Sequence, residues 1–254
     1  MLARRSLILG LSLGLWLVAV ASPASALGIA GYDMQIAVQG QNVGLGDLVT
    51  AKDVGWTPAT NGGTYTLKAP VSVGLDSNNQ PVFSIDSWTS QVDVDPFVTN
   101  NLNVTNTSGL TQTFVITVTL PIVPQTPATA MSGSVGITLT NTTGSATLAD
   151  AGTAVYTALI DGGSVQTLKN PAYTLTCIAP FCSVTDSASF GIPTPIVGPA
   201  ALSTIAIRLQ FTLSPGDSAG LTSVFNITAV PEPVTALMMG LGLLGLGLAG
   251  RRRA

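Results

Sequence analysis

Apolar and polar residues alternate with a period of two along much of this chain, a pattern typical of β-strands that bury one of their two faces. The alternation is clearest in Thr111–Leu120, Gly133–Asn141 and Ser203–Leu213. Each segment places apolar side chains on one side and mostly threonine, serine or glutamine on the other. We therefore predict three long strands with these inward residues: Phe114, Ile116, Val118, Leu120, Val135, Ile137, Leu139, Ile205, Ile207, Leu209, Phe211 and Leu213.

A weaker form of the pattern predicts shorter strands, and clusters of Asn, Asp, Gly and Pro predict the turns between them. One-sided strands must bury their apolar faces against a second layer, so we expect an all-β fold, an antiparallel β-sandwich of the jelly-roll or immunoglobulin-like kind. The stretch Pro121–Pro127 is short enough for a crossover between sheets, which favours one domain over residues 27–229. The shorter strands are expected at Met34–Val38, Thr64–Lys68, Val82–Ile85, Thr153–Ile160, Tyr173–Ile178 and Leu221–Thr228.

Charge is scarce in this chain of 254 residues. Only 8% of the residues are Asp, Glu, Lys or Arg, against about 25% in ordinary soluble proteins, and there is no histidine. The missing histidine excludes Ser-His-Asp and Cys-His catalysis and histidine-ligated metals. Between Leu27 and Val230 there are four basic residues and eleven aspartates, a net charge of −7, which argues against a nucleic-acid partner. We expect no cofactor.

The first 26 residues have the form of a secretory signal peptide that would begin as a helix. Arg4 and Arg5 precede the apolar run Leu7–Val20, and Ala24-Ser25-Ala26 is a small-x-small cleavage pattern, so we expect cleavage after Ala26. The alternative is an uncleaved membrane anchor. The expected partners at this stage are the secretion machinery and a signal peptidase.

The last 25 residues combine three features in a fixed order. Pro231-Glu232-Pro233 contains the only glutamate of the chain, and the 17 residues of Val234–Gly250 carry no charge. As a transmembrane helix they would span about 25 Å, slightly less than the roughly 30 Å hydrocarbon core of a bilayer. A basic cluster that would stay cytoplasmic then closes the chain: Arg251, Arg252 and Arg253.

Together these features resemble the PEP-CTERM sorting signal of Gram-negative bacteria, with the resemblance limited to residues 230–254. It implies that an exosortase, a membrane transpeptidase, recognises Pro231-Glu232-Pro233 and removes the helix. It also implies a producer of extracellular polysaccharide, and similar tails occur in proteins labelled ice-binding. The protein would be anchored in the inner membrane and then reach the envelope or the outside of the cell. A plain single-pass anchor is the alternative, although it leaves the Pro-Glu-Pro motif unexplained.

Two sets of residues could bind or crosslink. In an oxidising compartment Cys177 and Cys182 are expected to form a disulfide, with two free thiols as the alternative. Asp93 and Asp95 would share one face of an extended strand, where with Asp86 they could bind Ca²⁺ or form a glycosidase-like carboxylate pair. The simpler interpretation, which we favour, is that these aspartates cap turns or face solvent.

Polar rows and aromatic residues offer further candidates. The threonines of Thr111–Thr119 and Thr138–Thr140 could form a flat face for ice or polysaccharide, or could simply suit the outer side of a strand. Trp56, Trp88 and Tyr65 are the candidate aromatic platforms for a sugar, and at least one Trp is expected in the core. Four Asn-x-Ser/Thr triplets are interpreted as exposed polar positions: Asn103, Asn106, Asn141 and Asn226.

Three functions remain open from the sequence. The favoured one is a non-catalytic envelope or matrix protein, exported and processed by an exosortase. The second is a binding module for polysaccharide or ice, which requires exposed Trp side chains or exposed threonine rows. The third is an Asp-dependent hydrolase, which requires two carboxylates about 5–9 Å apart in a cleft.

Overall fold

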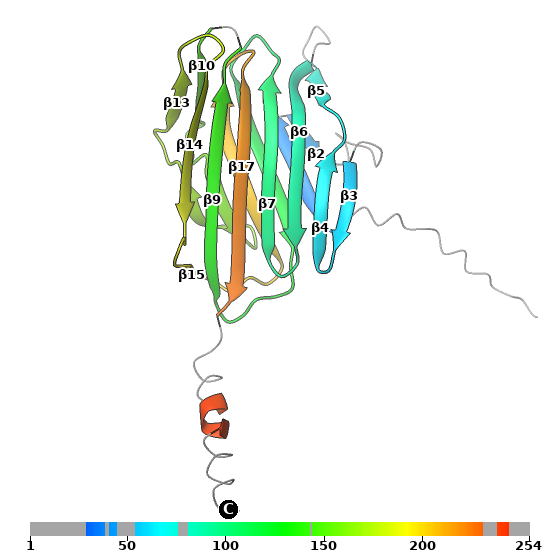
Figure 1. The fold of residues 1–254 in the computed structure, drawn as a ribbon, viewed down its shortest axis with the longest axis vertical. Coiled ribbons are helices and arrows are strands. Elements are labelled where there is room, and N and C mark those ends of the chain that lie inside the picture. The colour runs from blue at the N-terminus through cyan, green and yellow to red at the C-terminus, as the bar shows by residue number, and fades with distance from the viewer. Residues whose placement is uncertain are drawn as a thin grey trace, which may run out of the picture.

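Two antiparallel sheets packed face to face form the body of the protein (Figure 1). The structure, a computed structural model, describes residues 29–38, 41–44, 54–75, 81–142, 144–230 and 238–243. The all-β prediction is confirmed, whereas the finer choice between a jelly roll and an immunoglobulin-like order stays a prediction. The predicted signal peptide and most of the C-terminal tail lie outside the described residues.

The eight-stranded sheet lies behind the other in Figure 1 and runs β12-β11-β16-β8-β1-β2, with β10 and β13 beside the far end of β16. Strand β16 therefore pairs with β11 over its first half and with β10 over its last residues. The strands of this sheet are β1 (Asp33–Val38), β2 (Gln41–Gly44), β8 (Gln112–Pro121), β10 (Ala146–Asp150), β11 (Tyr156–Ile160), β12 (Gly163–Leu168), β13 (Thr174–Cys177) and β16 (Thr204–Leu213).

The nine-stranded sheet faces the viewer in Figure 1 and runs β14-β9-β17-β7-β6-β4-β3, with β15 pairing β9 and β5 pairing β6. Because β8 and β9 belong to different sheets, Pro121–Pro127 crosses from one sheet to the other. The strands of this sheet are β3 (Val54–Ala59), β4 (Gly62–Leu67), β5 (Val71–Leu75), β6 (Pro81–Asp93), β7 (Phe97–Asn106), β9 (Thr129–Thr140), β14 (Ser183–Phe190), β15 (Ile196–Gly198) and β17 (Ser218–Ala229).

Every residue predicted to point inward from the three clearest strands is buried. Three phenylalanines join the sheets at the centre of this core. Phe114 of β8 stacks on Phe211 of β16 with 5.3 Å between ring centroids, and meets Phe83 of β6 edge-on at 5.7 Å. Tyr156 adds a polar link, since its hydroxyl donates a 2.8 Å hydrogen bond from the eight-stranded sheet to the carbonyl oxygen of Val224.

Several predicted boundaries were wrong. Strand β6 extends to Asp93 rather than ending at Ile85, and Tyr173 lies just before β13 rather than within it. Strands β7 and β14 were not predicted, because inward polar residues interrupt their apolar alternation. Residues 238–243 form a short helix; among the described residues, no helix has the length and apolar character needed to cross a membrane.

Candidate functional site

The outer side of β14, β9, β17 and β7 is a broad surface of hydroxyl and amide side chains. The strands are paired so that their outward residues stand side by side in rows. The only ionisable residue in the four strands is Asp186, which lies at a position of β14 that faces inward and not at one that faces outward. We call this surface the hydroxyl–amide face: Ser183, Thr185, Ser187, Ser189, Ser132, Ser134, Gly136, Thr138, Thr140, Ser218, Gly220, Thr222, Val224, Asn226, Thr99, Asn101, Asn103 and Thr105.

A shallow hollow of about 460 Å³ lies near the middle of this face. At its floor Gly136 of β9 pairs with Thr222 of β17, and Thr138 pairs with Gly220. Each glycine leaves a gap beside a threonine, so the hollow follows from the placement of two residues without side chains. The lining also includes the uncharged polar residues Asn101, Thr185 and Ser187, and Asp186 is its one ionisable residue.

Hydroxyl groups at one end of the face are already occupied by each other. Thr105 hydrogen-bonds to Asp86 and, at 2.6 Å, to Ser218, while Ser84 donates to Asp86 at 2.7 Å. Around the hollow the situation differs. Within the described part of the chain, no side-chain hydrogen bond is made by Thr138, Thr222, Asn101, Thr185 or the Ser187 hydroxyl. The hydrogen bonds between side chains of the face therefore gather at one end, and the hollow lies within the part whose hydroxyl and amide groups are not bonded to each other.

The two threonine rows predicted from the sequence lie on opposite sides of the molecule. Thr138 and Thr140 belong to the hydroxyl–amide face, whereas the row of Thr111–Thr119 lies on the outer side of the eight-stranded sheet. They cannot combine into one binding surface. The serine and asparagine positions of β14 and β7, which extend the face, were missed because those strands were not predicted.

The proposed aromatic platforms are wrong for two of three residues. Trp88 is 1% exposed and its indole Nε1 donates a 2.6 Å hydrogen bond to Oδ1 of Asn100, as expected of a core tryptophan. Tyr65 is 3% exposed and stacks on Tyr32. Trp56 is half-buried against Tyr65, with 4.4 Å between ring centroids. These side chains form a packed aromatic cluster. The cluster supplies the apolar neighbours that a buried indole or phenol needs, together with an internal hydrogen-bond partner.

The aspartate pair does not share one face of a strand as predicted. Strand β6 ends at Asp93, whose Oδ1 accepts a 2.9 Å hydrogen bond from the backbone N–H of Asp95, so Asp93 caps the turn. The hollow described above contains Asp186 alone as a carboxylate, and a second one of about 280 Å³ contains Asp95 alone. Among the described residues no three acidic, cysteine or histidine side chains gather into a metal site.

Two further aspartates act as structural connectors. Backbone N–H groups of Leu202, Ser203 and Thr204 donate to Asp161 at 2.8–2.9 Å. Desolvation alone would raise the pKa of Asp161, but these donors and the Ser203 hydroxyl outweigh it and hold the pKa at about 2. Asp161 therefore joins the β11–β12 turn to the start of β16 while staying ionised.

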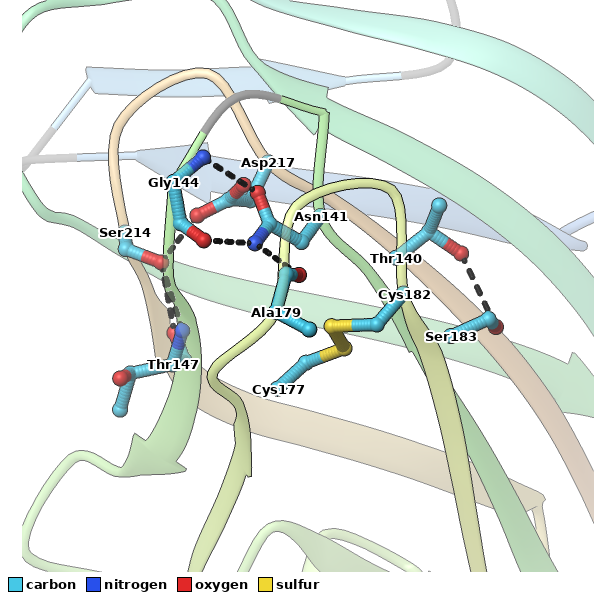
Figure 2. The surroundings of a disulfide bond; sticks show 10 residues. All are labelled: Thr140, Asn141, Gly144, Thr147, Cys177, Ala179, Cys182, Ser183, Ser214 and Asp217. Carbon is cyan, nitrogen blue, oxygen red and sulfur yellow. Dashed lines mark hydrogen bonds between the residues drawn. A yellow bond between two sulfur atoms is a disulfide. The ribbon is translucent and has the colours of Figure 1, made fainter.

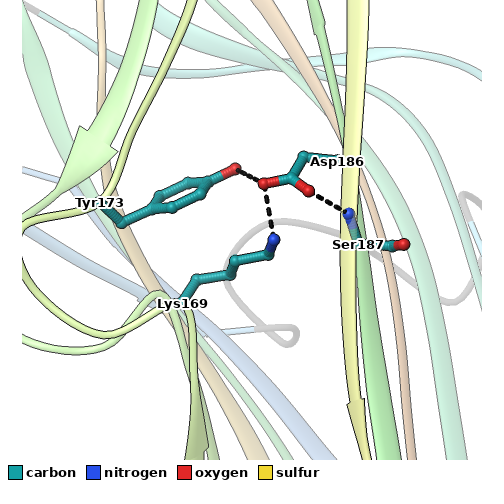
Figure 3. A network of polar contacts seen from close by, with 4 residues as sticks. All are labelled: Lys169, Tyr173, Asp186 and Ser187. Carbon is teal, nitrogen blue, oxygen red and sulfur yellow. Dashed lines mark hydrogen bonds and ion pairs between the residues drawn. The ribbon is translucent and has the colours of Figure 1, made fainter.

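Asp186 closes the open edge of the sandwich. It points inward from β14, an edge strand, and accepts a 2.6 Å contact from Lys169 and a 3.0 Å hydrogen bond from the Tyr173 hydroxyl (Figure 3). The Lys169 ammonium, followed by the Tyr173 hydroxyl, holds the pKa of Asp186 below its usual range despite partial burial. An inward charge on an edge strand also disfavours pairing with a further strand, because the added strand would have to bury it.

A disulfide joins Cys177 and Cys182, whose Cα atoms are 6.0 Å apart (Figure 2). Asn141 holds the loop between them, since its Nδ2 donates to the carbonyl oxygen of Ala179 at 2.9 Å and also to that of Gly144. At the tip, the side chains of Ile178 and Phe181 are 84% and 85% exposed.

The interpretation of the four asparagines as exposed was wrong for two. Asn141 is 1% exposed and Asn106 is fully buried. The Nδ2 of Asn106 donates to the carbonyl oxygens of Leu110, Leu213 and Ser214 at 2.8–3.1 Å. Both residues bind loops at the same end of the sandwich, so their amides replace the backbone hydrogen bonds that loops cannot make among themselves.

We expect the native protein to contain no free thiol. Cys177 is buried and Cys182 is packed against the core, and an oxidising compartment favours the bonded form. Labelling the native protein with a thiol-specific reagent should give no adduct until a reductant is added, after which two adducts should appear by mass spectrometry. Full labelling before reduction would contradict this expectation.

No protein-family model matches the chain, and no curated protein matches it. One solved structure similar to part of it is the enzymatically active domain of tailspike protein 4 of bacteriophage CBA120. The two sequences are 11% identical. The match covers 76% of this chain and 19% of the tailspike chain, and its TM-score is 0.26. The chain therefore spans about a fifth of that protein, and the score is too low to indicate a shared fold or function.

Proposed function

We propose that the protein is a non-catalytic component of the cell envelope or extracellular matrix, exported and then sorted through its C-terminal tail. The observation that supports this most directly is the hydroxyl–amide face, a wide uncharged surface on a body with one continuous core. The aspartates Asp86, Asp93, Asp161 and Asp186 each hold strands or turns in place, which is a structural use of the carboxylates.

The tail supplies the sorting part of the proposal, although Pro231-Glu232-Pro233 and the terminal arginines lie outside the described residues. Glu232 stands between two prolines, and because proline disfavours both helix interiors and sheet ladders, we expect an extended motif that an enzyme can reach. Three guanidinium groups would cost several kcal/mol to move into hydrocarbon, so the arginines would fix the depth of the apolar segment. The partner in this step is an exosortase.

Changing Glu232→Ala is expected to leave membrane insertion intact and to block removal of the tail, because the apolar segment and the arginines are untouched. The mass of the protein in the producing cells should then stay that of the unprocessed form, and the protein should remain in the membrane fraction. Replacing Arg251, Arg252 and Arg253 with glutamine is the comparison: it should disturb orientation and retention instead.

If Glu232→Ala protein is released with the normal mass and at the normal rate, the sorting part of the proposal fails. A plain anchor or another protease would then account for the tail. Deletion of the exosortase gene should reproduce the Glu232→Ala result, because both changes remove the same processing step.

The hydroxyl–amide face also favours a second candidate function, a binding module for polysaccharide. The aromatic form of that hypothesis is excluded for Trp88 and Tyr65 by their burial. Binding through hydroxyl and amide groups remains, and it needs the open hydrogen-bonding groups that surround the hollow.

A further inference from the structure

Gly136 and Gly220, at the floor of the hollow, are not required by the fold. A Cβ atom at Gly136 would come no closer than 4.0 Å to Thr222, and one at Gly220 no closer than 3.6 Å to Thr138. Neither glycine has a positive φ. By contrast, a Cβ at Gly133 of the same strand would lie 2.6 Å from the Phe190 ring, so packing explains that glycine.

Glycine in a strand interior is unfavourable, since it loses the most backbone freedom on folding and has no side chain to pack. Such a glycine often marks a place where a ligand approaches the backbone closely. Here two of them lie diagonally across a strand pair, at the centre of a face whose neighbouring positions are nearly all hydroxyl or amide. The sequence thus keeps a hollow open at a cost in stability.

The polar groups around the hollow are open to a ligand. Thr138, Thr222 and Asn101 have no internal side-chain hydrogen bond among the described residues, unlike Thr105 and Ser218 at the end of the face. These groups can both donate and accept hydrogen bonds, which matches the hydroxyl groups of sugars.

We propose that the hollow between Gly136 and Gly220 is a binding subsite for an uncharged polysaccharide chain lying across the hydroxyl–amide face. This inference rests on the proposed function, since a protein of the envelope or extracellular matrix is in contact with such polymers. The ligand is uncharged because the lining of the hollow has no basic group to pair with an anion, and the segment from Leu27 to Val230 as a whole carries a net charge of −7. Asp186, beside the hollow, is already paired with Lys169.

The ligand is a polymer rather than a single sugar because the site has no aromatic platform. Each neutral hydrogen bond replaces one to water and contributes little net affinity. A chain that contacts several rows of the face at once gains affinity through its many weak contacts. A crystalline ice surface fits less well, since the hollow interrupts the flat contact that a planar lattice needs.

The test fills the hollow without damaging the fold. In the double variant G136V/G220V the added Cβ atoms have room, the outward methyl groups fill the hollow and valine favours strands, so the melting temperature should be unchanged or up to about 4 °C higher. Purified full-length protein would be passed over immobilised cellulose, xylan, dextran and galactomannan, with the anionic polymer alginate for comparison. We expect the wild-type protein to be retained on at least one neutral polymer and the variant to bind it about tenfold more weakly.

The matched control is Gly55→Val on β3, where a Cβ also has room in the same sheet but far along the strand order from the hollow. Gly55→Val should leave retention on the polymer unchanged. Free glucose should not compete with the polymer for the wild-type protein. The inference would be overturned if the wild-type protein were retained on none of the neutral polymers, or if G136V/G220V were retained as strongly as the wild-type protein. It would also be overturned if the wild-type protein were retained on alginate as strongly as on the neutral polymers, or if it inhibited ice growth without being retained on any polymer. None of these outcomes depends on the tail, so failure here is distinguishable from failure of the Glu232→Ala experiment.

Discussion

Replacing Phe114 with alanine is expected to lower the free energy of unfolding by about 3–5 kcal/mol. Phe114 is fully buried and contacts one phenylalanine in its own sheet and one in the opposite sheet. Its removal would take away both ring contacts and leave a cavity between the sheets that the strands, held by their ladders, can close only in part. Denaturant unfolding followed by tryptophan fluorescence would measure the change.

The control for this substitution is Thr113→Ala, the next residue along β8, which points outward. Its effect should stay within about 0.5 kcal/mol, because a partly exposed threonine on an outer face loses few contacts. A small effect of Phe114→Ala, comparable with that of Thr113→Ala, would show that the two sheets do not share the core described above.

Asn106→Ala is expected to cost about 3 kcal/mol of stability, although the residue contributes no apolar contact. Its amide donates to the carbonyl oxygens of Leu110, of Leu213 at the end of β16 and of Ser214 just after it, and its Oδ1 accepts from the backbone N–H and hydroxyl of Ser108. Alanine would leave several of these buried groups without partners, and each unsatisfied group costs about 1–3 kcal/mol. Thermal unfolding would show a lower melting temperature.

Asn101→Ala provides the comparison, since it changes the same residue type on the same strand at an exposed position. It should leave stability nearly unchanged. Asn106→Asp should be at least as damaging as Asn106→Ala, because a carboxylate would face three carbonyl oxygens without a proton to donate. If the Asn106 and Asn101 variants were equally stable, the hydrogen bonds of Asn106 would not have the stabilising role that we assign to them.

The sequence was most informative where one strand face is entirely apolar. In β8, β9 and β16 the alternation is regular, and the predicted inward side chains are buried. It was least informative in β7 and β14, where Asn100, Asn106 and Asp186 occupy inward positions. Inward polar residues are tolerated there because each has at least one partner inside the fold, such as Trp88 for Asn100, Leu213 for Asn106 and Lys169 for Asp186, and alternation within one strand does not reveal these partners.

The candidate site depends on strand order, which alternation within one strand does not contain. Gly136 and Gly220 are 84 residues apart in the sequence and become neighbours only because β9 pairs with β17. For the same reason the threonine rows of β8 and β9 looked alike in sequence yet lie on opposite sides of the protein. Trp88 was misleading in a different way, since its burial depends on Asn100 supplying an acceptor inside the core.

The position of β17 has a mechanical consequence. This strand is the last before Val230, and it pairs along its full length with β9 and over most of it with β7. A tether beyond Val230 that pulls along the strand would load both ladders in shear, so many backbone hydrogen bonds would have to rupture together instead of opening one after another. The sandwich should therefore withstand tension from its C-terminal end far better than tension that peels an outer strand such as β3.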